Sequence, residues 1–583
     1  MDILLKAFML LGGLAFFLYG MNVLSGGLSK LAGGALERSL KRMTSNRFAA
    51  MGLGIGITIA IQSSSAMTVM LVGLVNSGIM TLGQTIGVIM GSNIGTTLTP
   101  WIFSLSGIDG SGWISLLKPE VFSLAVAFVG IVMIMGSKKS RQKDIGSICV
   151  GFAVLMYGMK LMGDSVAGLE NSPVFGQFIK IFENPLLGVL FGAVVTGIIQ
   201  SSAASVAMLQ ALALGGAISY QIAIPIIMGQ NIGTCVTAVI SSIGVSQNAK
   251  KVSVVHIVFN LIGTTLGLLL FFGLNSMIHF SFASMPIDAA GIALVHTVFN
   301  IFTTAILLPF TTQLEKIANC LVKPSKKDKG SVFLDERLLR TPSVAVSESF
   351  AMTCKMADVM QDAIFAAMDQ FKKYSSQKAE QILQEEDELD KFEDNLGSFL
   401  VQLSSKALTE KDSRQSSRVL HAIGDFERMG DHAVQLLKGA EEMHTKKIVF
   451  SPDAQKEIDQ LSAAVAEIVR LTVNAFKTND TAMAQRVEPL EQVIDAMLAK
   501  AKSGHVERLQ SGKCTIQMGF VQADMLTNFQ RISDHCSNIA VAVIELQEGA
   551  FETHQYLTET KESGSNHFAE YYKEYARKYE IRS

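Results

Sequence analysis

Two long stretches of the chain carry apolar residues without a single charged one. Phe48 to Ile108 and Asn184 to Ala249 contain no Lys, Arg, Asp or Glu. Uncharged runs of this length are typical of membrane segments. From Asp335 to Leu546 the pattern changes, because apolar positions recur there at helical spacing among many charges. The pattern predicts an all-α chain, with a polytopic membrane half followed by a water-soluble half.

Composition sharpens this division. The first 312 residues hold 24 charged residues, whereas the remaining 271 hold 76. The chain is 49% hydrophobic, which excludes a disordered protein, and its six cysteines show no paired spacing for disulfides or zinc. No basic footprint indicates nucleic-acid binding. No nucleotide-binding glycine loop, nucleophile elbow or His-Glu metalloprotease motif indicates an enzyme.

The membrane half contains one unit twice, at a fixed offset of 138 residues. The matching segments are Tyr19-Gly20-Met21 with Tyr157-Gly158-Met159, Gln62-Ser63-Ser64 with Gln200-Ser201-Ser202, and Asn93-Ile94-Gly95-Thr96 with Asn231-Ile232-Gly233-Thr234. One offset kept over this distance indicates internal duplication. The first copy covers about 1–137 and the second about 144–276, and a final span lies near 287–310.

Loop charge predicts that the two copies are inverted. Segment 25–47 has a net charge of +4, whereas its counterpart 163–185 has −2. By the positive-inside rule, these equivalent loops lie on opposite faces of the membrane. We therefore expect a multi-pass protein of a bacterial inner (plasma) membrane, with its N-terminus outside and its C-terminal half in the cytoplasm.

Each copy is predicted to contain a re-entrant hairpin followed by an interrupted span. The predicted elements are a span near 2–24, a hairpin near 48–77, an interrupted span near 80–106 and a span near 120–136, then equivalents near 146–163, 185–215, 218–243 and 252–275. The Gln-Ser-Ser segments lie at the hairpin tips, and segments 91–97 and 229–234 break the following spans. Inverted repeats with broken helices are typical of secondary transporters.

These polar breaks predict a shared site for an anion and cations. Irregular backbone at membrane depth is tolerated where it is buried in protein or lines a watery cavity. Helix N-termini and serine hydroxyls at the tips offer donors to an anion, and the oxygens of Gln62, Gln200, Asn93, Asn231, Thr96 and Thr234 suit Na⁺. Without charged side chains there, a bound anion needs co-bound cations, which predicts coupling. The alternative is that these small polar residues only pack helices.

The paired Gln-Ser-Ser motifs, each followed by Asn-x-Gly-Thr, resemble those of the type II sodium–phosphate cotransporters over residues 1–312. The resemblance implies sodium-driven uptake of inorganic phosphate by alternating access. It implies substrate and ion contacts from Gln62, Ser63, Ser64, Ser65, Asn93, Thr96, Gln200, Ser201, Ser202, Asn231 and Thr234. The second tip departs from the first, because Ala203 stands at the position equivalent to Ser65.

The soluble half is also duplicated. We expect a basic linker at 313–339, a helical domain at 340–550, and a charged, Tyr-rich tail at 551–583 that is either an amphipathic helix or frayed. The expected helices lie near 344–373, 376–406, 409–441, 453–478, 482–510 and 515–547. Phe426 to His432 matches Phe529 to His535, which predicts two three-helix bundles in tandem.

The segment Glu427-Arg428-Met429-Gly430-Asp431-His432 in this duplicated helical half resembles the PhoU-like domain of phosphate signalling. The resemblance implies metal binding, by divalent or iron ions, at Glu386, Asp390, Glu427, Asp431, Glu491, Asp495 and Asp534. Carboxylates four residues apart lie on one helix face and suit hard cations. A solvated acidic helix face is the alternative.

Two functions remain open from the sequence. One is a symporter that moves inorganic phosphate with sodium across the bilayer and carries a cytoplasmic regulatory domain. The other is a membrane phosphate sensor or adaptor that relays phosphate status through the PhoU-like domain to a cytoplasmic phosphate-signalling protein. Sodium stoichiometry, direction in the cell and oligomeric state stay open.

Overall fold

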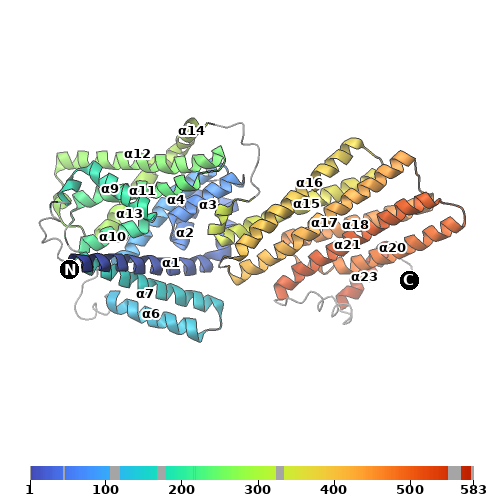
Figure 1. Ribbon diagram of the computed structural model, residues 1–583, viewed down its shortest axis with the longest axis horizontal. Helices are drawn as coiled ribbons and strands as arrows, with labels where there is room; N and C mark the ends of the chain where they lie inside the picture. The colour runs from blue at the N-terminus through green and yellow to red at the C-terminus, as the bar shows by residue number, and fades with distance from the viewer. Residues whose placement is uncertain are drawn as a thin grey trace. The chain divides into compact units, whose positions relative to one another are not determined.

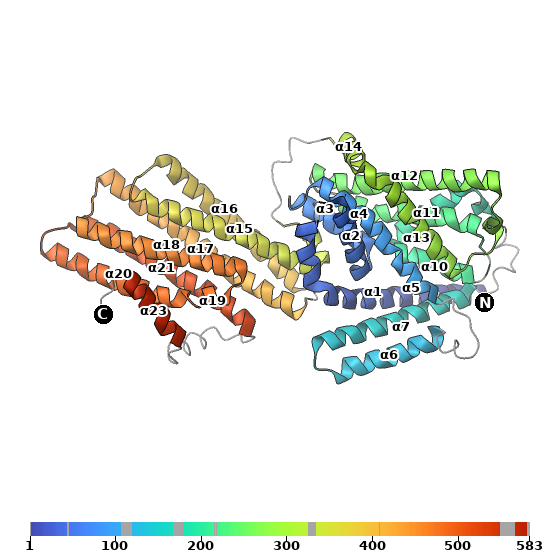
Figure 2. The same ribbon diagram turned by 180° about the vertical axis from the view of Figure 1, so that it is seen from behind.

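The computed structural model describes residues 2–43, 46–105, 119–166, 177, 179–214, 216, 218–323, 334–406, 408–548 and 566–579. Over these residues the chain is helical, and an isolated bridge between Ser219 and Pro286 is the one β-type pairing. The all-α prediction is confirmed. The helices form two compact units, Met1–Val344 and Ala345–Ser583. Figures 1 and 2 show the helices of each unit from opposite sides.

The first unit contains both copies of the repeat. The first copy folds into α1 (Asp2–Met43), α2 (Arg47–Ile61), α3 (Ser64–Asn76), α4 (Leu82–Thr96), α5 (Leu98–Ser104) and α6 (Pro119–Gly136). The second folds into α7 (Ser140–Val166), η4 (Ile181–Glu183), α9 (Pro185–Ile199), α10 (Ser202–Leu214), α11 (Tyr220–Ser241) and α12 (Gln247–Ile278). The unit ends with η5 (Ser281–Ser284), α13 (Ala289–Leu307), η6 (Leu308–Phe310), α14 (Thr311–Leu321) and η7 (Glu336–Arg340).

Within the described residues, five helical stretches are long and apolar enough to cross a membrane. They are Leu4–Leu31, Ser140–Val166, Tyr220–Ser241, Gln247–Ile278 and Ala289–Leu321. The pairs α2/α3 and α9/α10 are shorter apolar helices, each joined by a two-residue break where hairpins were predicted. The membrane half therefore combines these long helices with two helix-break-helix segments.

Two sequence expectations need correction. The segment 229–234 does not interrupt a helix, because α11 runs through it without a break. Its counterpart in the first copy, segment 91–97, is interrupted at Thr97, between α4 and α5. The predicted linker 313–339 overlaps helix α14 at its start and the short helix η7 at its end, and its residues 324–333 lie outside the described part of the chain.

Glycines bring the long helices α1 and α7 to very close approach. A Cβ on Gly13 would lie 2.9 Å from the Gly158 oxygen, and one on Gly20 would lie 2.7 Å from the Gly151 oxygen. Later residues of α1 thus meet earlier residues of α7, so the two helices run antiparallel. Because α1 and α7 are the same segment of the repeat, their opposite directions are those that inverted copies require. Small residues of this kind are common where membrane helices pack.

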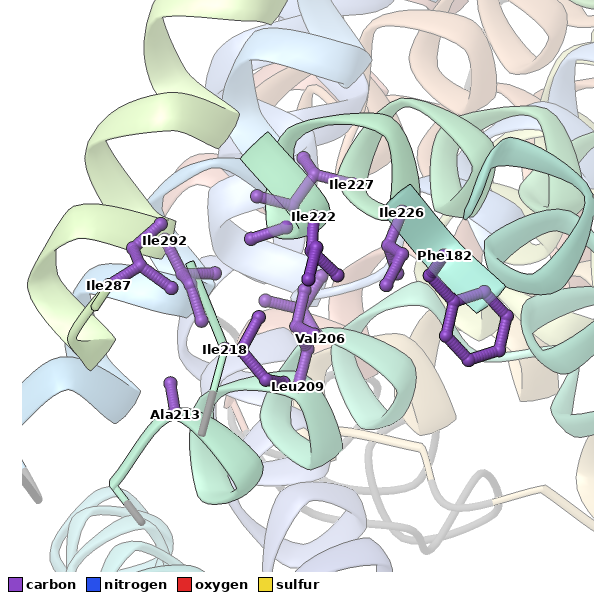
Figure 3. Packing of buried hydrophobic residues seen from close by; sticks show 11 residues of the cluster. Phe182, Val206, Leu209, Ala213, Ile218, Ile222, Ile226, Ile227, Ile287 and Ile292 are labelled. Atoms are coloured by element: carbon purple, nitrogen blue, oxygen red, sulfur yellow. The ribbon is translucent and has the colours of Figure 1, made fainter. Parts of the chain in front are cut away.

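An apolar cluster fixes the second helix-break-helix segment against its neighbours. Figure 3 shows Val206 and Leu209 of α10 together with Ile222 and Ile226 of α11, and with Ile292 of α13. All five side chains are at most 7% exposed. Dense packing of this kind holds the start of α10, which carries a candidate serine, in one position.

The second unit is a helical bundle whose elements follow the predicted ones closely. They are α15 (Pro342–Gln370), α16 (Ser376–Ser404), α17 (Glu410–Lys446), α18 (Pro452–Thr478), α19 (Thr481–Ala484), α20 (Val487–Gln510), α21 (Ile516–Glu548) and α23 (Asn566–Lys578). The predicted helix 482–510 is split into α19 and α20. Pro489 explains the split, because proline lacks an N–H and is tolerated only in the first turn of α20.

The described part of the tail contains a helix that packs on the bundle. In α23, Tyr575 is 2% exposed, and the Arg486 guanidinium lies 5.6 Å from its ring centroid. Lys578 pairs with Glu467 at 2.7 Å. Of the two alternatives for the tail, the helix is correct for 566–578, and residues 549–565 and 580–583 lie outside the described part.

Candidate functional site

The two Gln-Ser breaks have the same backbone conformation. Gln62 ends α2 with φ 56° and ψ 28°, and Gln200 ends α9 with φ 56° and ψ 24°. This left-handed region usually favours glycine and costs other residues roughly 1–2 kcal/mol. Both copies keep glutamine there, so the side chain has a use. The Gln62 amide donates to the Ile59 oxygen and its own oxygen accepts from the Thr99 hydroxyl.

A serine caps the helix that follows each break. The Ser63 hydroxyl accepts a hydrogen bond from the Ala66 N–H at 3.1 Å, and the Ser201 hydroxyl accepts one from the Ala204 N–H at 3.2 Å. Each cap leaves the serine hydroxyl hydrogen free to donate elsewhere. The first N–H groups of α3 and α10 precede the first intrahelical bond and give each helix start a positive end.

These breaks meet at one pocket of about 220 Å³. No charged side chain is among the described residues that line it. The lining residues are Met21, Asn22, Ser25, Gln62, Ser63, Ser64, Ser65, Thr96, Thr99, Gln200, Ser201, Ser202 and Ala203. The pocket is thus a neutral, polar chamber to which both copies contribute equivalent segments.

Most of the predicted site residues lie at this pocket, and three do not. Asn93, Asn231 and Thr234 are buried away from it. The Asn93 amide donates to the Ile89 oxygen within its own helix, and the Thr234 hydroxyl donates to the Gln230 oxygen. Asn231 donates to Asn300 of α13 at 3.3 Å. Their partners are those of helix-packing residues, whereas Thr96 of the same motif lines the pocket.

Sequence reasoning missed Asn22, Ser25 and Thr99. The Ser25 hydroxyl donates to the Ile61 oxygen at 2.6 Å, so α1 is tied to the end of α2 beside the break. Thr99 could have been found, because Thr237 stands at the same offset of 138 residues in the second copy. Asn22 and Ser25 gave no such signal, since Lys160 and Gly163 stand at their equivalent positions.

The soluble unit gathers the first predicted acidic cluster without forming a metal site. Glu427 of α17 is partly buried, and this burial, together with the nearby carboxylates Asp431, Glu393 and Asp390, raises its pKa to about 7. The pKa of Glu386 is raised too, by burial and then by Asp390 and Asp431. Among the described residues, however, no three His, Cys, Asp or Glu side chains could hold one metal ion.

The second predicted cluster differs from the first. Asp534 of α21 lies 3.5 Å from the Arg531 guanidinium, which already supplies a positive charge. Glu491 and Asp495 lie on α20, where Asp495 is exposed. The donor set therefore fits a cation poorly in the second half, and the iron site implied by the resemblance finds no support among the described residues.

Glu427 makes the stability of the soluble unit depend on pH. Because its folded-state pKa is above the unfolded value, ionisation costs stability as pH rises from about 4.5 to 7, and the cost then stays constant. In a fragment that starts at Thr341, Glu427→Gln should raise the unfolding free energy at pH 8 by about 1–2 kcal/mol, after a discount for solvent screening. Urea unfolding at pH 8 and pH 4.5 measures this.

The gain from Glu427→Gln should disappear at pH 4.5, where the wild-type carboxyl is already neutral. Glu507→Gln provides the control, because Glu507 is exposed on α20. A stabilisation by Glu427→Gln that is equal at both pH values would contradict the pKa shift of Glu427.

Comparison with known proteins identifies a family domain in each half of the chain. The profile of the Na⁺/Pi-cotransporter family matches residues 16–164 and 155–285, and that of the PhoU domain matches 353–440 and 458–543. Each profile thus matches twice, in the two copies found from the sequence. The "Putative inorganic phosphate export protein YjbB" of Escherichia coli (strain K12) is 22% identical over 545 residues, which cover 92% of this chain and 97% of that protein.

Two other relatives match shorter parts of the chain. "Uncharacterized protein YqeW" of Bacillus subtilis (strain 168) is 28% identical over 312 residues, which cover 53% of this chain and 96% of that protein. The "Sodium-dependent phosphate transport protein 2A" of Rattus norvegicus is 39% identical over 105 residues, which cover 18% of this chain and 16% of that protein. The chain thus carries a Na⁺/Pi-cotransporter domain in its N-terminal half and PhoU domains in its C-terminal half.

Proposed function

We propose that the membrane unit moves inorganic phosphate together with Na⁺ through the pocket between the two Gln-Ser breaks, by alternating access. The observation that carries this proposal is that the pocket is polar but has no charged side chain among its described lining residues. Helix starts and hydroxyls from both copies meet there. Such a site favours an anion only when its charge is balanced by something that binds with it.

The charge balance favours sodium as the balancing ion. Two helix N-termini supply roughly half a positive charge each, about one in total, which is less than the charge of a divalent phosphate ion. The oxygens of Gln62, Gln200 and Thr96 are neutral hard ligands at the same pocket. Oxygens of this kind at broken helices coordinate Na⁺ in other transporters. One or more sodium ions would therefore enter with each phosphate.

The orientation in the membrane belongs to this proposal. The Ser246 N–H donates to the Asn76 oxygen at 2.8 Å, so the end of the first hairpin lies beside the loop that precedes Lys250 and Lys251. Those lysines favour the cytoplasmic side. We place the first hairpin as re-entrant from the cytoplasm, the second from outside, the N-terminus outside, and the PhoU domains in the cytoplasm of a bacterial cell as the regulatory part.

The direction of net transport follows from gradients. A symporter is reversible, and the relatives named as phosphate export proteins are compatible with outward flow when internal phosphate is high. In the proposed mechanism phosphate and Na⁺ bind on the same side of the membrane and cross together, so phosphate leaves only a side that contains both ions. Sodium on the opposite side alone would not support transport.

Proteoliposomes with the purified full-length protein test the proposal. Labelled phosphate should enter the vesicles when Na⁺ is outside. Its uptake should fall to the level of protein-free liposomes when choline replaces Na⁺. Vesicles loaded with phosphate should release it only when they also contain Na⁺. Transport in choline driven by a fixed proton gradient would refute sodium coupling.

The same preparation separates the transporter from the sensor. A sensor would bind labelled phosphate at the pocket in detergent but would move none across the liposome membrane under any sodium gradient. Sodium-dependent accumulation excludes that second candidate. Binding without movement, in protein whose orientation in the vesicles has been verified, would favour it.

A further inference from the structure

The segment that precedes the soluble unit docks on the far end of the first hairpin. Asp335 and η7, which together span 335–340, follow the described end of α14 and pack against α3. Leu338 is fully buried, and a Cβ on Gly73 of α3 would lie 3.3 Å from its Cδ2 atom. Two residues later Pro342 begins α15, which continues into the soluble unit. We name residues 335–340 the docked segment.

A buried polar network joins this segment to α3. The Asn76 amide, at the last residue of α3, donates to the Asp335 carboxylate at 2.6 Å, and Asp335 is only 3% exposed. The Asn76 oxygen accepts from the Ser246 N–H at 2.8 Å. Asn76 therefore uses both ends of its amide to tie α3 to the docked segment and to the loop between α11 and α12.

Arg337 closes the network. Its guanidinium pairs with Asp335 at 2.9 Å and donates to the Ile243 oxygen, in the same loop, at 2.8 Å. The Asp335 carboxylate also accepts from the Arg337 backbone N–H at 2.9 Å. A carboxylate this buried is retained only with its partners, and removal of one partner leaves charge or polar atoms uncompensated.

The network exists on one hairpin only. Leu214 stands at the position of Asn76 in the second copy, at the end of α10, and cannot make these hydrogen bonds. The asparagine therefore has no explanation in the repeat itself. Its partner Asp335 lies beyond both copies, in the segment that leads to the PhoU domains.

We propose that Asp335 and Asn76 are positioning residues that restrain the first hairpin, so that the docked segment acts as a brake on its movement. The 13-residue helix α3 has Asn76 at one end and Ser64, at the pocket, at the other. A contact that ties the Asn76 end to the α11–α12 loop must break, or move with both elements, when the pocket opens to the other side. This inference rests on the proposed function, in which the hairpin moves during transport.

Hydrogen exchange of the full-length protein in lipid nanodiscs tests the restraint without any transport assay. Asn76→Leu, which copies the second repeat, and Asp335→Asn should each speed amide exchange in α3 by about tenfold or more. Arg340→Gln is the matched control, because Arg340 is exposed in the same segment. Unchanged exchange in both network variants, or equal acceleration in the control, would overturn the restraint.

Transport then tests the brake. In proteoliposomes, both network variants should raise kcat for sodium-dependent phosphate movement by about threefold or more, with KM for phosphate within about twofold, because the pocket lining is untouched. A lower kcat with faster α3 exchange would show that docking supports the working hairpin and would overturn the brake. If neither the wild type nor any variant transports phosphate, the proposed function fails. The hydrogen-exchange result still decides whether the docked segment restrains α3.

A double variant guards against misfolding. Asn76→Leu combined with Asp335→Leu removes both polar partners and leaves no buried carboxylate, while Arg337 is 27% exposed and can reach water. It should show the same α3 exchange as the single variants. Wild-type exchange in a well-folded double variant would mean that the single changes acted through an unpaired charge, and the proposal would be wrong.

Discussion

Replacement of both Ser64 and Ser202 by alanine should abolish sodium-dependent phosphate transport in proteoliposomes. Each serine begins a helix at the pocket and is at most 7% exposed. A hydrogen bond to a charged group contributes about 1.5–3 kcal/mol, so each loss should weaken phosphate binding roughly 10- to 150-fold. Each single variant should therefore raise KM strongly, and the double variant should approach the background of protein-free liposomes.

The choice of control for these serines depends on the tertiary structure. Ser25 is unsuitable, because it lines the pocket itself and its hydroxyl donates to the Ile61 oxygen at the end of α2. Ser276→Ala is a better control, since Ser276 is exposed near the end of α12 and its hydroxyl donates to the Gly273 oxygen of the same helix. Wild-type transport and phosphate KM in Ser64→Ala and Ser202→Ala would return these residues to a packing role.

A second large effect is expected from a single methyl group at Gly91. In Gly91→Ala the new Cβ would lie 2.0 Å from the Met51 oxygen, and in Gly229→Ala it would lie 2.0 Å from the Val189 oxygen. A backbone oxygen cannot move away as a flexible side chain can. The helices α2 and α4, or α9 and α11, would therefore have to separate by about 1.3 Å or more to reach ordinary C···O contact. Each variant should lose about 3–5 kcal/mol of stability, measured as a fall in thermal unfolding temperature in detergent.

Gly52→Ala is the control that distinguishes a packing role of Gly91 from a role in backbone flexibility. Gly52 lies on α2, where a Cβ would meet nothing within 4 Å, so alanine there should be neutral or stabilising. If Gly91 instead served as a flexible break, Gly91→Ala would fold as stably as Gly52→Ala and would fail only in transport. That result would refute the packing role that the structure indicates.

The sequence by itself determined the division of the chain, the duplicated halves, the positions of the two Gln-Ser breaks and most of the pocket residues. The reason is that these features are local or repeated. An uncharged run predicts membrane, a Gln-Ser-Ser segment in its middle predicts a break, and recurrence at 138 residues shows that the break has a counterpart. The helices of the soluble unit followed from spacing for the same reason.

The tertiary structure alone decided which polar residues face the pocket and which pack helices. Asn93 and Thr96 stand three residues apart in one motif, yet only Thr96 lines the pocket. Asn93 lies about one helical turn earlier in α4, where its amide donates to the Ile89 oxygen. The glycines of the second motif do not break α11 but let it approach α9 closely. Local sequence cannot predict this role, because it depends on which helix packs against α11. The pairing of Asn76 with Asp335 is a contact across 259 residues. No local or repeated pattern encodes such a contact, and only the packing of distant segments brings the two side chains together.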